Sequence, residues 1–303
     1  MLPPTDPGWR SDPLIVDLLS RCSFPAPRTP VVCAVSGGAD SLTLLVLAVA
    51  AGCHPEAVHV DHRLRPGSAS EAVRVGEVAE ALDVPWRSVA VEVEAGSDLE
   101  NRARQARYAA LPEGVLTGHT AEDQAETVIL QLLRGAGPAG ASGIRPGPNR
   151  PILGLRRAET EILCAGLGLS PVVDPSNTDP RFRRNRVRHE VLPVLADVGD
   201  RDPVPLLVRH ADLCRAANDH LVATAGGIDP TDARALATAP PALAAEAVRC
   251  WLRPHIHGYP PDQAAVERVL EVARLERRAC EVAGGVRVAR RAGRLEVELR
   301  SPS

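Results

Sequence analysis

The sequence of 303 residues contains no lysine, and all 35 of its basic residues are arginine. A Walker A phosphate loop requires a lysine, so the chain cannot be a P-loop NTPase of that kind. A lysine Schiff base is excluded for the same reason. The formal net charge is only −3, so overall charge does not indicate nucleic-acid binding, which would need a local basic patch.

Paired cysteines and long apolar segments are also missing. The seven cysteines are scattered, and none forms a Cys-x-x-Cys pair. We therefore expect buried free thiols rather than a disulfide framework or a zinc site. The longest largely apolar stretch, residues 42–52, is too short to cross a bilayer, which needs roughly 20 residues. No signal peptide is visible, so we expect a cytoplasmic protein without membrane attachment.

Residues 31–133 alternate between strand-like and helix-like segments. The expected strands are 31–35, 57–61, 86–93 and 114–118, and the expected helices are 40–51, 70–82, 98–111 and 120–133. Such alternation is typical of a parallel sheet built from βαβ units. Ligands of these sheets bind beyond the carboxyl ends of the strands. We therefore predict an α/β fold with its functional residues at those ends.

The rest of the chain has a different pattern. Residues 135–185 are rich in Gly, Pro, Asn and Arg, and the Gly- and Pro-containing stretch 199–205 is typical of a linker. Further helices are expected at 157–168, 185–196, 206–225, 231–253 and 261–280. Two alternating runs joined by Ala292-Gly293 predict a terminal β-hairpin. We expect a domain at 1–200 and a smaller, mainly helical domain at 201–303.

The first strand leads into Ser36-Gly37-Gly38-Ala39-Asp40-Ser41 at the start of a helix. Glycines let backbone N–H groups approach an anion, and a helix N-terminus adds partial positive charge, so the segment suits a phosphate. Ser36 and Ser41 add hydroxyl donors, and Asp40 suits Mg²⁺ held against pyrophosphate. The alternative is an ordinary strand-to-helix turn capped by Ser36 or Asp40.

This S-G-G-x-D-S segment resembles the PP-loop of the ATP-pyrophosphatase superfamily, which splits ATP into AMP and pyrophosphate while adenylating a substrate. Four more segments resemble the short form of the tRNA(Ile)-lysidine synthetase family. They are VHVDHRLRPGSASEA (58–72), ENRARQARYAAL (100–111), GHTAEDQAETVILQLLRG (118–135) and DPSNTDPRFRRNRVRHEVLPVL (174–195). One departure is Glu122, where that family usually has Asp. The resemblance implies a Rossmann-like PP-loop domain of the adenine nucleotide alpha hydrolase type and a small tRNA-contacting domain.

The resemblance implies an ATP-dependent ligase that joins lysine to C2 of the wobble cytidine in the tRNA(Ile) with a CAU anticodon. The cytidine is first adenylated, and the lysine ε-amine then expels AMP to give lysidine. The product changes codon specificity from AUG to AUA and amino-acid specificity from methionine to isoleucine. The implied cofactors and partners are ATP, Mg²⁺, L-lysine and this tRNA, and a homodimer is a candidate assembly.

Three polar residues of 118–133 are also informative by their spacing. His119, Asp123 and Glu126 lie four and three residues apart, which predicts one shared helix face. Two acids and a histidine beside a phosphate loop suit an ammonium group or a metal. The alternative is that Thr120 and Asp123 form a helix cap and that the acids stabilise the helix dipole.

The resemblance assigns roles to these residues. His119, Asp123 and Glu126 are expected to bind lysine, and Asp40, Asp123 and Glu126 to be catalytic. A lysine ammonium bound by carboxylates must lose a proton as it attacks, so Asp123 or Glu126 is expected to be the base. The expected ATP-binding residues are Ser36 to Ser41, Asp61 and His62, with Asp40 as the magnesium ligand.

A basic run at 181–188 holds five arginines in eight residues. Arginines can follow RNA phosphates and stack on splayed bases, whereas the alternative is a solvated helix face. The resemblance assigns tRNA contact to Arg104, Arg107, Arg134, Arg184, Asn185 and Arg188. Arginines of the terminal hairpin are a second candidate contact.

Other functions stay open. A tRNA thiolase of the same superfamily would need a catalytic cysteine, and a nucleotide-binding module without chemistry would lack an acid for Mg²⁺ such as Asp40. The segment His59-Val60-Asp61-His62 is similar to a metal site. Strand alternation places His59 and Asp61 on one face while His62 begins a loop, which argues against a metal site. The resemblance implies that Asp61 and His62 face nucleotide or tRNA, and the alternative is a structural role.

Overall fold

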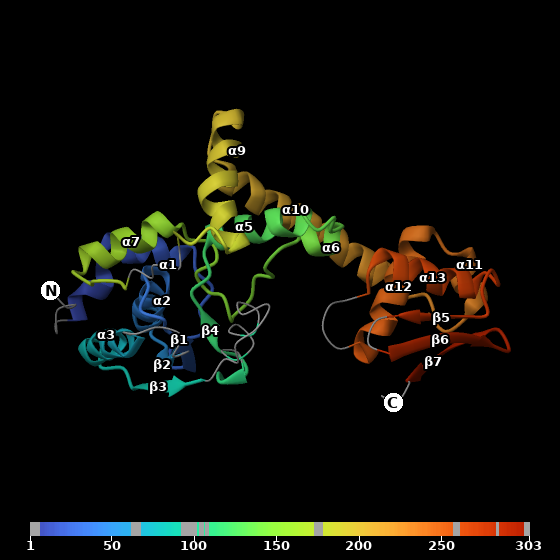
Figure 1. Ribbon diagram of the computed structural model, residues 1–303. Helices are drawn as coiled ribbons and strands as arrows, with labels where there is room; N and C mark the ends of the chain where they lie inside the picture. Colours follow the sequence, from blue (N-terminus) through green and yellow to red (C-terminus); the bar gives the residue numbers. More distant parts are fainter. Residues whose placement is uncertain are drawn as a thin grey trace. The chain divides into compact units, whose positions relative to one another are not determined.

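The computed structural model describes residues 7–61, 68–91, 102, 106, 109–172, 178–256, 261–282 and 285–299. The chain forms two compact units, Met1–Ala211 and Asp212–Ser303 (Figure 1). The division falls within helix α10 (Pro203–Ala225). The boundary expected from the sequence, at 200–201, precedes this division, and α10 begins between the two.

The first unit contains a four-stranded parallel sheet with the strand order β3-β2-β1-β4. Its strands are β1 (Pro30–Ala34), β2 (His54–Asp61), β3 (Trp86–Ala90) and β4 (Leu116–Thr117). The expected α/β class is confirmed. Strand β4 is shorter than the predicted 114–118, because Gly114 has a φ of +82° and turns the chain before Leu116 pairs with Cys33.

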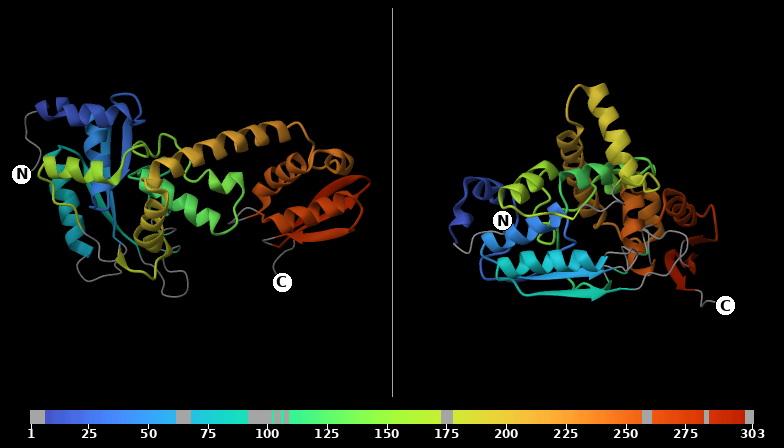
Figure 2. Two further views of the ribbon diagram at one scale, coloured as in Figure 1. Left: turned by 90° about the horizontal axis from the view of Figure 1, so that it is seen from above. Right: turned by 60° about the vertical axis from the view of Figure 1, so that its left-hand side comes forward.

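Helices cover this sheet and extend beyond it. They are η1 (Pro7–Ser11), α1 (Pro13–Ser20), α2 (Ala39–Ala50), α3 (Ser68–Ala81), α5 (Ala121–Leu132), α6 (Pro138–Ala141), α7 (Arg157–Gly166), α8 (Arg183–Arg186), η3 (Val187–Val191) and α9 (Leu192–Gly199). Figures 1 and 2 show α7 lying beyond α2, on the side away from the strands. The predicted helix 98–111 lies almost entirely outside the described residues.

Helix α2 is apolar on nearly all sides because it packs against both the sheet and α7. Leu44 and Leu45 are fully buried, and burying such a side chain contributes roughly 1.5–3 kcal/mol. Alternate strand residues divide between the two faces of the sheet. Cys33 and Ala57 join the helical core, whereas Val58 joins a smaller apolar cluster. This packing fixes the position of the first turn of α2, shortly after the end of β1.

The second unit is mainly helical and ends in an antiparallel sheet, as expected. Its elements after α10 are α11 (Ala233–Thr238), α12 (Pro241–Leu252), η4 (Arg253–His255), α13 (Gln263–Ala273), β5 (Ala279–Val282), β6 (Val286–Arg291) and β7 (Arg294–Leu299). The strand order is β5-β6-β7, so the predicted terminal hairpin gains a third strand.

Two helices predicted for this unit are wrong in their extent. The predicted helix 261–280 ends at Ala273, because Leu275 adopts a φ of +68°, and β5 follows with Cys280 buried and Glu281 exposed. The predicted helix 231–253 is divided into α11 and α12. Two consecutive prolines at 240–241 separate them, since proline cannot continue a helix.

Candidate active site

The phosphate loop between β1 and α2 is closed by hydrogen bonds among its own residues. The N–H of Ser36 donates to Oγ of Ser41 at 3.1 Å, and this Oγ donates to the carbonyl of Gly38 at 2.9 Å. Gly37 has a φ of +86°, which favours glycine. Gly38 is the N-cap of α2 and no side chain caps the helix, so the alternative of a cap by Ser36 or Asp40 is wrong. The first N–H groups of α2 therefore suit an anion.

The loop lies where the strand order of the sheet reverses. From β1 the chain proceeds to β2 and β3 on one side, whereas β4 pairs with the other side of β1. Ligands of open parallel sheets bind at such a switch point, beyond the carboxyl ends of the strands. The segments that follow β1 and β4 contain the phosphate loop and His119, so the topology brings two predicted groups of site residues together.

Gly118, directly after β4, approaches the first turn of α2 closely. A Cβ at this position would lie 2.8 Å from the carbonyl oxygen of Asp40 and 3.1 Å from Cα of Ser41. Only glycine fits this approach without displacing the helix start. This role of Gly118 was not predicted from the sequence, although Gly118 precedes His119 in the segment 118–135.

His59 lies behind the phosphate loop and not in a metal site. Its Nδ1 is 2.9 Å from the carbonyl oxygen of Val35. A carbonyl only accepts, so Nδ1 carries the proton and fixes the peptide that joins Val35 to Ser36. His59 is 2 % exposed, and its Nε2 has no hydrogen-bond partner within the described structure. No three His, Cys, Asp or Glu side chains there are grouped so as to hold a metal ion.

Asp40 stands in the first turn of α2 and contacts α7. Its Oδ1 accepts a hydrogen bond from Oγ1 of Thr160 at 2.5 Å, and its Oδ2 accepts one from Nε of Arg157 at 3.3 Å. Burial raises the pKa of Asp40, and the bonds to Thr160 and Arg157 act in the opposite direction. An oxygen ligand is thus held next to the phosphate loop. Neither contact from α7 was predicted from the sequence.

Asp123 takes part in the helix cap that the sequence offered as an alternative. Its Oδ2 accepts a hydrogen bond from the N–H of Thr120, the N-cap of α5, at 2.8 Å. Its Oδ1 lies 3.2 Å from NH2 of Arg184. Burial opposes ionisation of Asp123, but the charges of Arg184, His119 and Arg157 outweigh it and lower the pKa. Asp123 is therefore a cap and, at the same time, a carboxylate held ionised.

His119 is not on the helix face that its spacing predicted. Helix α5 begins at Ala121, so His119 precedes the N-cap. Its Nδ1 is 2.8 Å from Oγ1 of Thr117, a residue of β4. It nevertheless lies close enough to Asp123 to lower the pKa of that carboxyl.

Glu126 is completely buried and surrounded by arginines. Its Oε2 accepts a hydrogen bond from Nε of Arg184 at 2.6 Å, and its Oε1 accepts one from Nε of Arg188 at 2.7 Å. The basic run that was predicted to contact RNA thus sends two arginines inward, onto α5. Asn185 is also buried, and its Nδ2 donates to the carbonyl of Asp179 at 3.0 Å.

Arg157 connects the phosphate loop with α5. Besides Asp40, its guanidinium lies 3.6 Å from Oδ1 of Asp123 and 3.6 Å from Oε1 of Glu126. Its backbone N–H donates to Oε2 of Glu122 at 2.8 Å, while Oε1 of Glu122 accepts from Nε of Arg156 at 2.7 Å. Glu122 therefore anchors the start of α7.

The structure gives less information on the remaining predicted site residues. His62, Arg104 and Arg107 lie outside the described residues. Asp61 is the last residue of β2 and half-buried, and Arg134 is exposed immediately after α5.

The exposed members of the basic run are Arg181, Arg183 and Arg186. Arg181 pairs with Asp179 at 2.7 Å and Arg186 with Glu190 at 2.9 Å. Arg183 is exposed and has no acidic partner in the described part of the chain. The run is therefore divided between an inward face on α5 and an outward face available to solvent.

The thiols are poorly suited to catalysis. All seven are free, and most are buried or half-buried. Burial raises the pKa of Cys33 and of Cys22 to about 12, and the pKa of Cys164 to about 11. A nucleophilic cysteine needs the opposite shift, because the thiolate is the reactive form.

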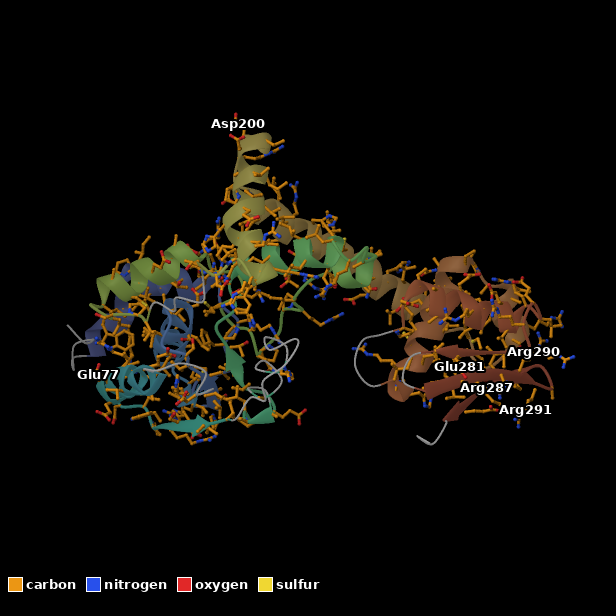
Figure 3. The ribbon with its side chains drawn as sticks, viewed as in Figure 1. Glu77, Asp200, Glu281, Arg287, Arg290 and Arg291 are labelled. Carbon is orange, nitrogen blue, oxygen red and sulfur yellow. The ribbon has the colours of Figure 1, made fainter. Side chains whose placement is uncertain are left out.

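The arginines of the terminal hairpin, which were a second candidate for tRNA contact, are paired with groups of the second unit. Figure 3 labels Arg287, Arg290 and Arg291 among its strands. Arg287 and Arg291 both contact Glu298, at 2.8 and 2.6 Å, and Arg290 donates to the carbonyl of Ala273. These contacts stabilise the three-stranded sheet and its packing on α13.

None of the helices among the described residues combines the length and the apolar character that spanning a membrane requires.

Comparisons with known proteins agree with this geometry. Residues 16–195 match the family model of the PP-loop domain. A tRNA(Ile)-lysidine synthase of Nocardia farcinica is 45% identical over 247 residues, covering 76% of this chain and 77% of that protein. One of Salinispora tropica is 39% identical over 305 residues, covering 88% and 90%.

Among solved structures, the U34-tRNA thiolase NcsA from Methanococcus maripaludis aligns with a TM-score of 0.52 at 14% identity. The alignment covers 69% of this chain and 81% of that one, and shows a shared fold only. The family model and the curated relatives decide the family. The chain belongs to the tRNA(Ile)-lysidine synthase family of PP-loop proteins.

Proposed function

We propose that this chain uses ATP to ligate lysine to C2 of the wobble cytidine of the tRNA(Ile) with a CAU anticodon. The observation that carries the proposal is the arrangement at the switch point of the sheet. A phosphate loop with Asp40 and an acid pair on α5 are joined there by the contacts of Arg157. The relatives' printed name supports the choice of tRNA and of lysine.

The phosphate loop is proposed to bind the triphosphate of ATP. The first N–H groups of α2 and the hydroxyls of Ser36 and Ser41 are donors for phosphate oxygens. Asp40 fits a magnesium ligand, because Mg²⁺ takes one or two carboxylates together with phosphate oxygens. When bound, Mg²⁺ would neutralise phosphate charge next to Asp40. Asp61 and His62, which follow β2, are proposed to contact the nucleotide.

The proposed reaction has two steps. O2 of the cytidine attacks the α-phosphorus of ATP, forming an O–P bond as the bond to pyrophosphate breaks. The ε-amine of lysine then attacks C2, and the C2–O bond breaks with its electron pair leaving on AMP. One proton of the amine is released in this step. The product is lysidine, which reads AUA instead of AUG and specifies isoleucine instead of methionine.

In the second step, the lysine ammonium must lose a proton before its nitrogen can attack C2. With a pKa of about 10.4, only about one lysine amine in 2,500 is neutral at pH 7, a cost of roughly 4.6 kcal/mol. We propose that His119, Asp123 and Glu126 form the lysine site and that one of the two carboxylates receives the proton. The side chain of Asp123 keeps 14% exposure, whereas that of Glu126 has none, so Asp123 is the more accessible acid.

The basic run and its neighbours are proposed to bind the tRNA. We retain Arg104, Arg107, Arg134, Arg184, Asn185 and Arg188 as the proposed contacts. Arg184 and Arg188 can reach RNA only by giving up Glu126, which now accepts both. Arg183, which is exposed and has no acidic partner among the described residues, is proposed as a further contact that needs no such exchange.

One experiment tests the activity directly. The protein is incubated with ATP, labelled lysine and a tRNA(Ile) transcript with a CAU anticodon, and the nucleosides are then analysed. We expect lysidine together with AMP and pyrophosphate. Formation of a thiolated nucleoside instead would support a thiolase. A variant without the seven cysteines should keep the ligase activity.

A further inference from the structure

One guanidinium contacts the proposed ATP half and the proposed lysine half of the site together. Nε of Arg157 is 3.3 Å from Oδ2 of Asp40, while NH2 and NH1 are 3.6 Å from Asp123 and from Glu126. Asp40 belongs to α2, and both other acids belong to α5. Arg157 comes from a third element, α7, and is therefore the direct link between two groups of carboxylates.

The position of Arg157 is fixed by its backbone as well as by its side chain. Glu122 accepts the N–H of Arg157 at 2.8 Å, so α7 begins against α5. One turn later, Thr160 donates to Asp40 at 2.5 Å, so the same helix also contacts α2. The Arg157 side chain is 21% exposed. It can therefore leave the three acids for solvent or phosphate without unfolding α7.

We propose that Arg157 competes with the cations of the reaction, Mg²⁺ at Asp40 and the lysine ammonium at Asp123 and Glu126, and thereby couples nucleotide binding to lysine binding. This inference rests on the proposed function. Each of these cations needs carboxylate oxygens that Arg157 contacts. A cation arriving at either half must displace the same guanidinium.

Sharing one guanidinium makes the two binding events cooperative. The first cation to arrive bears the free-energy cost of displacing Arg157 from the cluster. The second cation then finds its carboxylates already released, so it binds more tightly. Such coupling is reciprocal, and lysine must therefore tighten nucleotide binding by the same factor. Arg184 also contacts Asp123 and Glu126, and Arg188 contacts Glu126, so the charge balance of the two acids does not depend on Arg157 alone.

The test measures lysine affinity by calorimetry, with and without the magnesium complex of α,β-methylene-ATP, which cannot be split between its α- and β-phosphates. In the unmodified protein we expect this complex to tighten lysine binding roughly fivefold or more, the lower end of typical coupling. In Arg157→Met, lysine should bind more tightly than in the unmodified protein when no nucleotide is added. Addition of the nucleotide complex should then change its affinity little.

The matched control is Arg156→Met, on the neighbouring residue, whose guanidinium contacts Glu122 and Asp202 instead. It should keep the coupling of the unmodified protein. Equal lysine affinity with and without nucleotide in the unmodified protein overturns the inference, and this measurement needs no variant. Weaker lysine binding by a folded Arg157→Met protein also overturns it. If lysine is still transferred to tRNA in either case, the proposed function stands and only the coupling is wrong.

Discussion

Nε of Arg184 lies 2.6 Å from Oε2 of Glu126, so the arginine-rich segment is fastened to the helix that carries the acid pair. Arg188 contacts the other carboxylate oxygen of Glu126 at 2.7 Å. These two bonds hold the turn of α8 and η3 against α5. The proposed lysine site and the proposed tRNA-binding segment are thereby parts of one packed cluster.

Glu126→Gln should destabilise the first unit. The substitution removes a fully buried charge and leaves Arg184 and Arg188 without their shared anion. We expect a loss of about 3 kcal/mol in the free energy of unfolding, the lower limit for breaking a buried pair, because both arginines keep some exposure. Urea denaturation at pH 7 measures this change.

The matched control for that change is Glu190→Gln. Glu190 pairs with Arg186 at 2.9 Å, and both side chains are about half exposed. Its unfolding midpoint should stay close to that of the unmodified protein. Equal destabilisation by the two substitutions would contradict a structural role for the buried Glu126 cluster.

Asp123→Asn should keep ATP binding and fail in lysine transfer. The hydrogen bonds that close the phosphate loop do not involve Asp123, whereas the lysine ammonium and its released proton depend on the Asp123 charge. The amide oxygen can still accept the N–H of Thr120, so the start of α5 should persist. Incorporation of labelled lysine into tRNA measures the second step, and Asp197→Asn on α9 serves as the control. Unchanged incorporation would remove Asp123 from the lysine site.

Asp123 should also contribute to the pH dependence of stability. Its pKa is lower in the folded state than in the unfolded chain, where it is about 3.9. A carboxyl of this kind stabilises the fold above the unfolded pKa, and the contribution is lost as pH falls through the folded pKa. Below pH about 4, stability should therefore fall less steeply in Asp123→Asn than in the unmodified protein. Chemical denaturation at successive pH values measures the two slopes.

Local patterns account for the parts of the site that the sequence predicts well. The phosphate loop is a continuous segment, and the helix of Asp123 and Glu126 shows its period within a few turns. The contacts of Arg157 depend instead on the packing of α7 against α2, which no local pattern contains. In the same way, the spacing of Arg183 and Arg184 does not indicate which of them meets a buried acid.

The wrong predictions of helices and strands have similar physical causes. Strand β5 has only four residues and follows a helix closely, so its alternation was too short to separate from a helical pattern. His119 was placed on α5 because spacing alone does not show where a helix begins. The N-cap at Thr120 decides this, and its carboxylate partner Asp123 was recognised only as an alternative.

Gly118→Ala should weaken ATP binding. The added methyl group would lie 2.8 Å from the carbonyl oxygen of Asp40, so the first turn of α2 has to shift. Overpacking of this kind costs about 1–3 kcal/mol. We expect a raised KM for ATP and a lowered unfolding midpoint. Gly147→Ala is the control, because a Cβ there meets nothing within 4 Å, and an equal effect of both substitutions would contradict the close approach.

The affinity for tRNA should decrease steeply as salt increases from about 50 to 200 mM, because arginines that bind RNA phosphates release counterions. Arg183→Ala should lower the affinity and reduce the slope of log K against log salt by about 1. Arg188→Ala should lower both the affinity and the unfolding midpoint, since Arg188 also contacts Glu126. Filter binding with the CAU-anticodon transcript measures the slopes. A flat salt response would contradict phosphate contacts by the basic run, and an unchanged slope in Arg183→Ala would exclude its outward face from the RNA interface.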